Sequence, residues 1–266
     1  MFRNLFNKKT KIRFHSINHS VTDMYPIIHS SKLNREWVET EKDEYQQRLS
    51  RCPFHFLAGN EVNSIGKCPA INMIMNNGYV LVSPIDTTVC LQGPELQVQS
   101  RMLPGGGPWA EAHSPHVSKW MHDSTKDKSA TQILKINTPW RVTCNNPNII
   151  FLLTKVPFVN ENRFSAVTGI LDPKHSIEMN SQLFWHVEDG KTEVIKAGTP
   201  LCMYIPMDRR VLQTPFECVD ADERDFKMEE DYRYNLLHSS PHHFTLNKKI
   251  ANMKRLLKKH YNINHE

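Results

Sequence analysis

The side chains best suited to metal chemistry gather in one stretch of the chain. Residues 104–131 are dense in histidine and tryptophan, and the candidate metal ligands among them are His113, His116, His122 and Asp123. Imidazole and carboxylate groups suit zinc or iron. Pro115 disfavours a regular helix between the first two histidines. His122 and Asp123 are too close together to form a facial triad by themselves, so a site needs a distant third ligand, such as His175 or His186. Without one, these are scattered histidines on a loop and the chain has no cofactor.

Cysteine gives a second place to look for a metal. Cys52 and His55 have a spacing that can open a zinc site, but no second pair completes the set. None of the six cysteines belongs to a C-x-x-C pair. We therefore expect free thiols in a reducing compartment. The cysteines are Cys52, Cys68, Cys90, Cys144, Cys202 and Cys218.

Composition sets few limits on function. The 266 residues are 39% hydrophobic and 23% charged, which is enough for a sizeable core in one large β domain with additions or in two domains. The net charge of +5 permits a nucleic-acid partner without arguing for one. No apolar run approaches the roughly 18 residues that a membrane span needs. The first residues lack the pattern of a signal peptide.

The sequence predicts that the elements which position the candidate metal ligands are β-strands. Residues 166–210 hold three short apolar segments with turn residues between them, which is typical of a compact β unit. The segment 188–191 carries an Asp-Gly pair, which predicts a β-hairpin turn. The almost continuously apolar segment 149–154 predicts a strand inside a sheet. The turn residues are Asp172-Pro173, Asp189-Gly190 and Ala197-Gly198.

Further apolar segments continue this pattern on both sides of an interruption at 93–131, which we treat as an insertion. The β region opens near Cys68. We predict one mostly antiparallel, mainly β domain over 68–210, a distorted jelly roll or barrel. The other predicted strands are 78–83, 87–91, 133–136 and 140–144.

The two ends of the chain predict peripheral helices. Residues 1–67 form an N-terminal extension with an edge strand at 12–14 and a surface helix over 34–50. Residues 211–266 comprise an acidic linker, at 220–231, and a basic helix over 246–261. We expect that helix to dock on the β domain or a neighbouring subunit through an apolar stripe, with its basic side chains meeting the acidic segment or nucleic acid. The stripe is Leu246, Ile250, Met253 and Leu257.

Three segments follow one another in the order of known sequence motifs. Gly78–Ser83, Thr168–His175 and Lys196–Met203 resemble the first, third and fourth motifs of the trimeric dUTPase family. The resemblance covers about half of the chain. It implies a dUTPase-like β core, and a homotrimer, because active sites in that family form between subunits.

Most catalytic positions of that family are replaced. Val80 stands at its first-motif Asp, and residues 154–158 lack the Arg-Ser pair that holds phosphates. Asp172 keeps the position that activates water in those enzymes, which makes it the one catalytic candidate. The alternative is that Asp172 only caps a turn. The candidate ligand-binding residues are Tyr79, His175, which replaces the family's Tyr, and Met203, which replaces its Gln.

The whole chain also resembles a protein family of large tailed phages, notably T4-like cyanophages. This resemblance implies a viral origin and a similar fold. The matching segments are 25–27, 37–38, 67–70, 136–140, 169–172, 197–200 and 205–206.

Three functions compete. The first is a non-enzymatic phage protein, a dUTPase-like β module that binds a protein partner or self-associates. The second is a metal-dependent enzyme that uses the histidine-rich insertion. The third is nucleotide binding without hydrolysis. The phage resemblance places the protein in the host cytoplasm or in the virion, and we expect no membrane partner.

Overall fold

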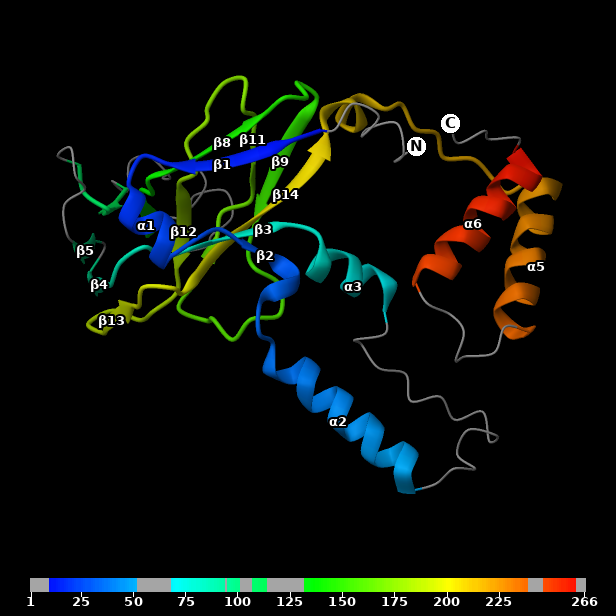
Figure 1. Ribbon diagram of the computed structural model, residues 1–266, viewed down its shortest axis with the longest axis horizontal. Helices are drawn as coiled ribbons and strands as arrows, with labels where there is room; N and C mark the ends of the chain where they lie inside the picture. The colour runs from blue at the N-terminus through cyan, green and yellow to red at the C-terminus, as the bar shows by residue number, and fades with distance from the viewer. Residues whose placement is uncertain are drawn as a thin grey trace. The chain divides into compact units, whose positions relative to one another are not determined.

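Antiparallel strand pairing organises most of the chain. A computed structural model describes residues 10–51, 68–93, 95–100, 107–113, 132–238 and 246–261. The chain divides into two compact units, Lys11–Leu212 and a second unit that contains residues 213–266 together with the start of the chain (Figure 1). The first unit is mainly β and the second is helical.

The largest sheet of the first unit has five strands in the order β11-β9-β14-β3-β2. Strand β9 pairs with both β11 and β14, which confirms that segment 149–154 lies inside a sheet. Its first three residues, Ile149, Ile150 and Phe151, are buried, as continuous apolar runs in inner strands are. The strands are β2 (Ile28–His29), β3 (Tyr79–Val82), β9 (Ile149–Thr154), β11 (Gly169–Leu171) and β14 (Pro200–Asp208).

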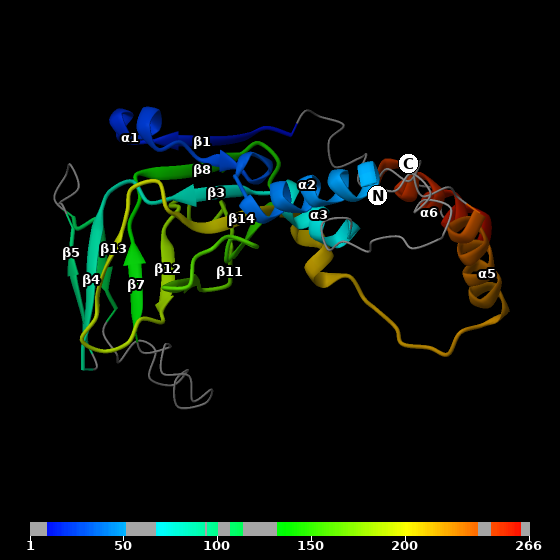
Figure 2. The same ribbon diagram turned by 90° about the horizontal axis from the view of Figure 1, so that it is seen from below.

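Three smaller sheets complete the first unit (Figure 2). The four-stranded sheet has the order β10-β12-β7-β6, with β6 (Ala110–Ala112), β7 (Ile133–Ile136), β10 (Phe164–Ala166) and β12 (Ser181–Trp185). The three-stranded sheet is β13-β4-β5, with β4 (Thr87–Gln92), β5 (Glu95–Gln99) and β13 (Thr192–Ile195). The last pair is β1 (Ile12–Ser16) with β8 (Trp140–Cys144).

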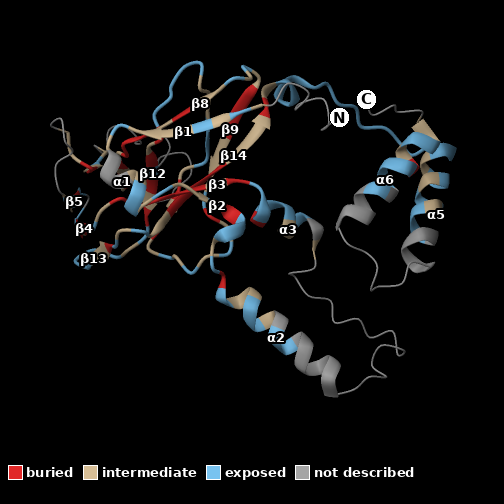
Figure 3. Ribbon diagram, viewed as in Figure 1, coloured by how far each residue is buried: buried red, intermediate tan, exposed pale blue. Residues whose placement is uncertain are grey.

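The predicted mainly β, antiparallel character is confirmed, because every pairing between named strands is antiparallel. Among the described strands no sheet closes into a barrel. Figure 3 shows that buried residues concentrate on the strands of this unit.

The interruption at 93–131 is smaller than predicted. Strands β5 and β6 both lie inside it and pair with β4 and β7. Gly93, at φ 60°, makes the turn between β4 and β5, a conformation that glycine adopts without a steric penalty. Leu96 alternates with exposed polar neighbours, so the period-two signal of a strand was present in the sequence.

The predicted hairpin at 188–191 is wrong. The turn itself forms, because Lys191 N donates to the Glu188 carbonyl at 3.3 Å. The strands on either side diverge, however: β12 pairs with β7 and β10, whereas β13 pairs with β4. Tertiary hydrogen bonds hold the turn instead, since Asp189 Oδ1 accepts from Gly93 N at 2.8 Å and Gly190 N donates to the Leu91 carbonyl at 2.9 Å.

The N-terminal part of the chain belongs to this unit rather than extending from it. Strand β1 pairs with β8, and β2 pairs with β3. Helix α2 (Glu36–Arg51) confirms the predicted surface helix, and α1 (His19–Met24) and the 3₁₀ turn η2 (Ser30–Lys32) precede it. The segment after Cys68, predicted to open the β region, is instead α3 (Pro69–Asn76), with Pro69 in the first turn where proline is tolerated.

One cluster of the core lies beneath the candidate site. It joins Val80 and Val82 of β3, Met203 of β14 and Val156 of the segment that follows β9. Partly buried residues surround it: Tyr25, Ile28, Leu33, Val159 and Ile205. This packing fixes the inner side of the β9–β10 connection.

The second unit contains two helices that contact each other, α5 (Glu223–His238) and α6 (Leu246–Tyr261). The predicted bounds of α6 are confirmed. The region predicted to be an acidic linker, 220–231, is largely helical, since α5 begins at Glu223. Asp222 caps this helix by accepting from Arg224 N and Asp225 N at 2.8 and 3.0 Å. Asp225 Oδ2 accepts from Asp222 N in return, which completes a capping box.

The apolar stripe of α6 differs from the prediction. Leu256, which was not assigned to the stripe, is buried, whereas Met253 is 39% exposed. The side chain of Asp231 on α5 binds both Lys259 and His260, and the Tyr261 hydroxyl donates to Asp225. The predicted meeting of basic and acidic segments therefore occurs, and within the described residues it joins α6 to α5.

Candidate functional site

Two adjoining hollows flank the connection between β9 and β10, which we call the 155–163 loop. The first, the polar cavity, has a volume of about 300 Å³. The second, the apolar groove, has a volume of about 310 Å³ and is lined by Trp37, Phe158, Val159 and Asn160. Phe158 and Val159 line both hollows, so the two form one continuous surface.

Phe158 lies at the centre of this surface in a strained conformation. Its φ of 58° places a bulky residue in the left-handed region, where such residues are rare. Its side chain is 40% exposed. The Trp37 Nε1–H donates to the Phe158 carbonyl at 3.2 Å, and the two rings lie 5.7 Å apart at 64°, an edge-to-face arrangement. Two separate contacts from α2 thus hold Phe158 in place.

Arg35 holds the 155–163 loop against the residues that precede α2. It is buried, with Nη1 and Nη2 donating to the Ser30 carbonyl and hydroxyl at 3.0 and 3.1 Å. Its Nε donates to the Pro157 carbonyl at 3.4 Å, next to Phe158. Burial lowers the pKa of this guanidinium from its ordinary value. Arg35 joins the start of α2, the η2 turn and the 155–163 loop into one rigid support.

The far end of the loop is tied down by an ion pair. Arg163 binds Glu161 through two nitrogen–oxygen contacts of 2.9 and 2.6 Å, a bidentate geometry, and donates to the Val194 carbonyl at 2.6 Å. The hydrogen bonds that Arg163 donates to Glu161 raise the pKa of Arg163. With Val156 buried in the core, the loop is anchored at its beginning, middle and end.

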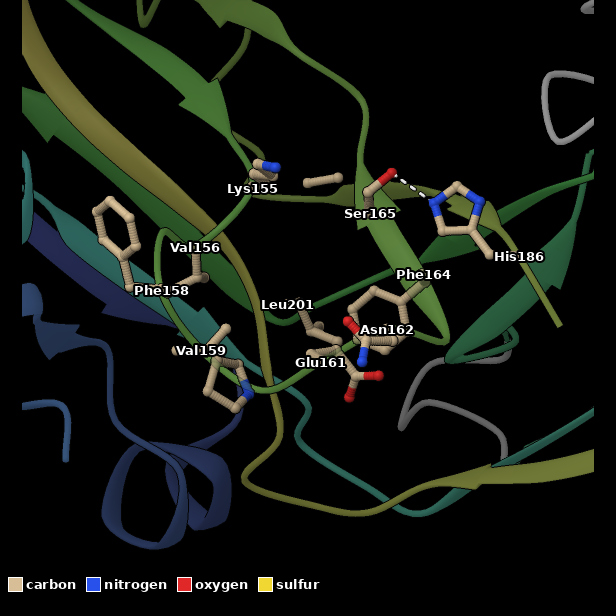
Figure 4. Close-up of a pocket in the computed structure, with 12 residues that line it drawn as sticks. Lys155, Val156, Phe158, Val159, Glu161, Asn162, Phe164, Ser165, His186 and Leu201 are labelled. Carbon is tan, nitrogen blue, oxygen red and sulfur yellow. Dashed lines mark hydrogen bonds between the residues drawn. The ribbon is translucent and has the colours of Figure 1, made fainter. Parts of the chain in front are cut away.

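The polar cavity carries the hydrophilic groups of the site. The side chain of Lys155 is exposed, and Ser165 Oγ lies 2.8 Å from His186 Nε2 (Figure 4). A serine–histidine pair is the beginning of a nucleophilic triad. Among the described residues, no carboxylate is hydrogen-bonded to the His186 ring. The cavity is therefore lined by the Lys155 ammonium, a hydroxyl–imidazole pair, the Asn162 amide and the Glu161 carboxylate, which is bound by Arg163.

The structure places Asp172 in a turn. Its Oδ1 accepts from Lys174 N at 3.0 Å, and its Oδ2 binds Arg209 Nη2. Partial burial on its own raises the pKa of Asp172, but the Lys174 hydrogen bond and Arg209 outweigh it and the pKa is lowered. His175 Nε2 lies 3.8 Å from the same carboxylate, with its side chain 83% exposed. Asp172 and His175 are the two predicted site residues that lie together.

Met203 and Tyr79 occupy packing positions. Met203 is fully buried in the core cluster, and a Cβ on Gly78 would lie only 3.0 Å from its Cγ and Sδ atoms. The Tyr79 ring packs against Phe14 at 4.7 Å. Burial, and then the neighbouring Cys144, raise the pKa of Tyr79. Neither residue lines the polar cavity or the apolar groove.

Of the four metal ligands predicted within residues 104–131, only His113 lies in the described part of the chain. His113 N donates to the Ile133 carbonyl at 2.8 Å, and its Nε2 is buried with no hydrogen-bond partner among the described residues. Residues 10–51, 68–93, 95–100, 107–113, 132–238 and 246–261 contain no group of three metal-binding side chains. The metal-ligand candidates that lie outside the described ranges are His116, His122, Asp123, Cys52 and His55.

Sequence reasoning did not single out Phe158, Lys155 or the Ser165–His186 pair as one site. Trp37 lies in the predicted surface helix over 34–50, and residues 154–158 were noted only because they lack the Arg-Ser pair. Pro157-Phe158 at the end of an inner strand was the available signal. Its meaning depends on Trp37 and Arg35, which lie more than a hundred residues earlier in the chain.

Comparison with protein-family models gives no match to this chain, and no curated protein matches it. Among the described helices, none combines the length and the apolar character that crossing a membrane requires.

Proposed function

We propose that this chain is a non-enzymatic β module that self-associates through the surface of Trp37, Phe158 and Val159, named here the Phe158 surface. The observation that carries the proposal is the held conformation of Phe158. Strained residues persist only where their surroundings fix them, and they gather at binding and active sites. The contacts from Trp37 and Arg35 hold the backbone of Phe158 in this conformation, while Phe158 remains 40% exposed.

A fixed aromatic ring suits an interface more than an active site. Aromatic anchors in apolar hollows contribute most of the binding energy at protein interfaces. Because Phe158 is already ordered in the free chain, its rotamer freedom is not lost again on association. The apolar groove beside it provides the concave half of such a contact.

Asp172, the one retained catalytic position, has another role that fits this proposal. Both of its oxygens are engaged, one by the Lys174 amide and the other by Arg209. Hydrolysis at a nucleotide needs a positioned water together with donors for the phosphates. A carboxylate that closes a turn and binds Arg209 supports the fold.

The finer points of the proposal rest on sequence resemblance. They comprise a dUTPase-like jelly roll, a homotrimer, a phage origin and a place in the host cytoplasm or the virion. For the dUTPase-like core, the support is that Gly78–Ser83 contains β3 and Lys196–Met203 leads into β14, so two motif-like segments pair with each other in one sheet. Thr168–His175 contains β11, which lies in the same sheet and is separated from β14 by β9.

The variant Phe158→Asn tests the proposal. Asparagine tolerates a φ near 58°, so the loop keeps its backbone while the apolar ring is lost. We expect association to weaken at least tenfold, with the free energy of unfolding of the monomer changed by about 1 kcal/mol or less. Sedimentation velocity over a range of protein concentrations measures the association.

The matched control is Ile170→Asn on β11, which removes an apolar side chain that is 51% exposed away from the Phe158 surface. The control should associate like the unmodified chain. Equal association of the Phe158→Asn variant and the unmodified chain would refute the proposal.

A further inference from the structure

One segment of the chain has the chemistry to fill the apolar groove. Residues 214–222, named here the arm, follow the 3₁₀ turn η6 (Arg209–Gln213) and precede α5. Every residue of the arm is exposed. Phe216 is 90% exposed and Val219 is 72% exposed, values that are unusual for large apolar side chains.

The arm also carries negative charge. Glu217, Asp220 and Asp222 lie within it, and the arm has no lysine or arginine. An aromatic residue beside carboxylates is a pattern suited to a groove that is apolar at one end and cationic at the other. Pro215 restricts the backbone before Phe216 and lowers the entropy lost when the segment is bound.

The Phe158 surface offers the complementary features. The apolar groove, about 310 Å³ and lined by Trp37, Phe158 and Val159, has room for an aromatic side chain. It continues into the polar cavity, where Lys155 is exposed. Figure 4 shows Phe158 on one side of this cavity and the Ser165–His186 pair on the opposite side.

We propose that the arm of a second copy of this chain binds the Phe158 surface, with Phe216 in the apolar groove and the arm's carboxylates facing Lys155. This inference rests on the proposed self-association and identifies its second half. The contact joins two different surfaces, so it is heterologous and closes into a ring when the rotation allows it.

Complementary variants test the contact. Phe216→Ala disables the arm and leaves the groove, whereas Phe158→Asn disables the groove and leaves the arm. Each variant alone should sediment as a monomer of about the 30.9 kDa chain mass. An equimolar mixture should form one-to-one dimers, because one arm and one groove remain functional. Reducing agent is included throughout, since Cys218 in the arm is exposed.

A synthetic peptide of residues 212–223 gives a second readout. We expect the labelled peptide to bind the Phe216→Ala chain by fluorescence anisotropy, and a peptide with Phe216→Ala to bind at least tenfold more weakly. Lys155→Gln in the protein should weaken binding of the unmodified peptide and reduce its dependence on salt.

The outcomes separate this inference from the proposed function. If Phe216→Ala associates as the unmodified chain does while Phe158→Asn does not, the Phe158 surface binds something other than the arm and the inference fails. A mixture of the two variants that stays monomeric also overturns it. Failure of Phe158→Asn to alter association overturns the proposed function itself.

Discussion

At the scale of single residues, the site depends on a few side chains whose contacts are long-range. Phe158 keeps its left-handed backbone because Trp37 and Arg35 both hold the loop from the start of α2. Removing the indole of Trp37 would leave the Phe158 carbonyl to water and free the loop to relax. The strained backbone and the exposed ring of Phe158 therefore depend on tertiary contacts from Trp37 and Arg35.

Asp172 gives a prediction about pH. Its folded pKa is lowered below the ordinary value of 3.8, despite the opposing effect of burial, by Lys174 and Arg209. A group with a lowered folded pKa stabilises the fold above its unfolded pKa, and that stability is lost as pH falls through the folded pKa. We expect Asp172→Asn to be less stable than the unmodified chain at pH 7 and the difference to vanish on acidification below pH 3.8.

Urea unfolding at pH 7 and at several values below pH 4 measures this effect, with each chain followed by tryptophan fluorescence. Asparagine still accepts from Lys174 N, so the comparison isolates the charge that faces Arg209. A stability difference that stays constant with pH would contradict the account.

Which residues form the site was largely beyond sequence reasoning. The alternative that Asp172 caps a turn agrees with the structure, because the Asp-Pro pair marks a turn locally. The association of residues 155–163 with Trp37 depends on contacts across more than a hundred residues, and no local pattern reports them. Met203 lies in the core because its strand is buried on both sides.

At the scale of elements, apolar periodicity predicted most strands and two helices. The strands that were missed include β5 and β6, which lie in a region whose composition resembles a loop, and the short strands β2 and β10. The pairing partners of β12 and β13 could not be read from the turn between them. There the turn binds β4 and the β4–β5 turn instead, because Asp189 Oδ1 accepts from Gly93 N and Gly190 N donates to the Leu91 carbonyl.

The cap of α5 gives a prediction at this scale. Asp222 accepts from two backbone amides of the first helical turn, so Asp222→Ala should cost about 1 kcal/mol of helix stability. Amide hydrogen exchange in residues 223–238 measures the loss. Asp220→Ala removes an exposed arm carboxylate and keeps the cap, so it should leave the exchange unchanged. Faster exchange in both variants would show that charge, and not capping, is responsible.

The basic character of α6 is partly neutralised inside its own unit. Asp231 binds Lys259 and His260, while Lys254 and Lys258 remain exposed. Nucleic-acid binding by this helix stays a prediction from its sequence. It would weaken steeply as salt increases, because each phosphate contact releases counterions.

At the scale of the whole molecule, the chain combines a β unit that carries a groove with a segment that can fill it. The groove belongs to the unit Lys11–Leu212, and in the sequence the arm lies between η6 and α5, within the second unit. An arm and a groove on the same chain allow identical copies to bind one another in sequence around a ring. If the proposed contact forms, self-association would need no further partner.

The mass of the full-length protein in solution tests this account most directly. Sedimentation equilibrium in reducing buffer should give a concentration-dependent mass that rises from 30.9 kDa to a fixed multiple of it, with three copies expected for the dUTPase-like trimer. A mass that remains at 30.9 kDa at every concentration would contradict the account.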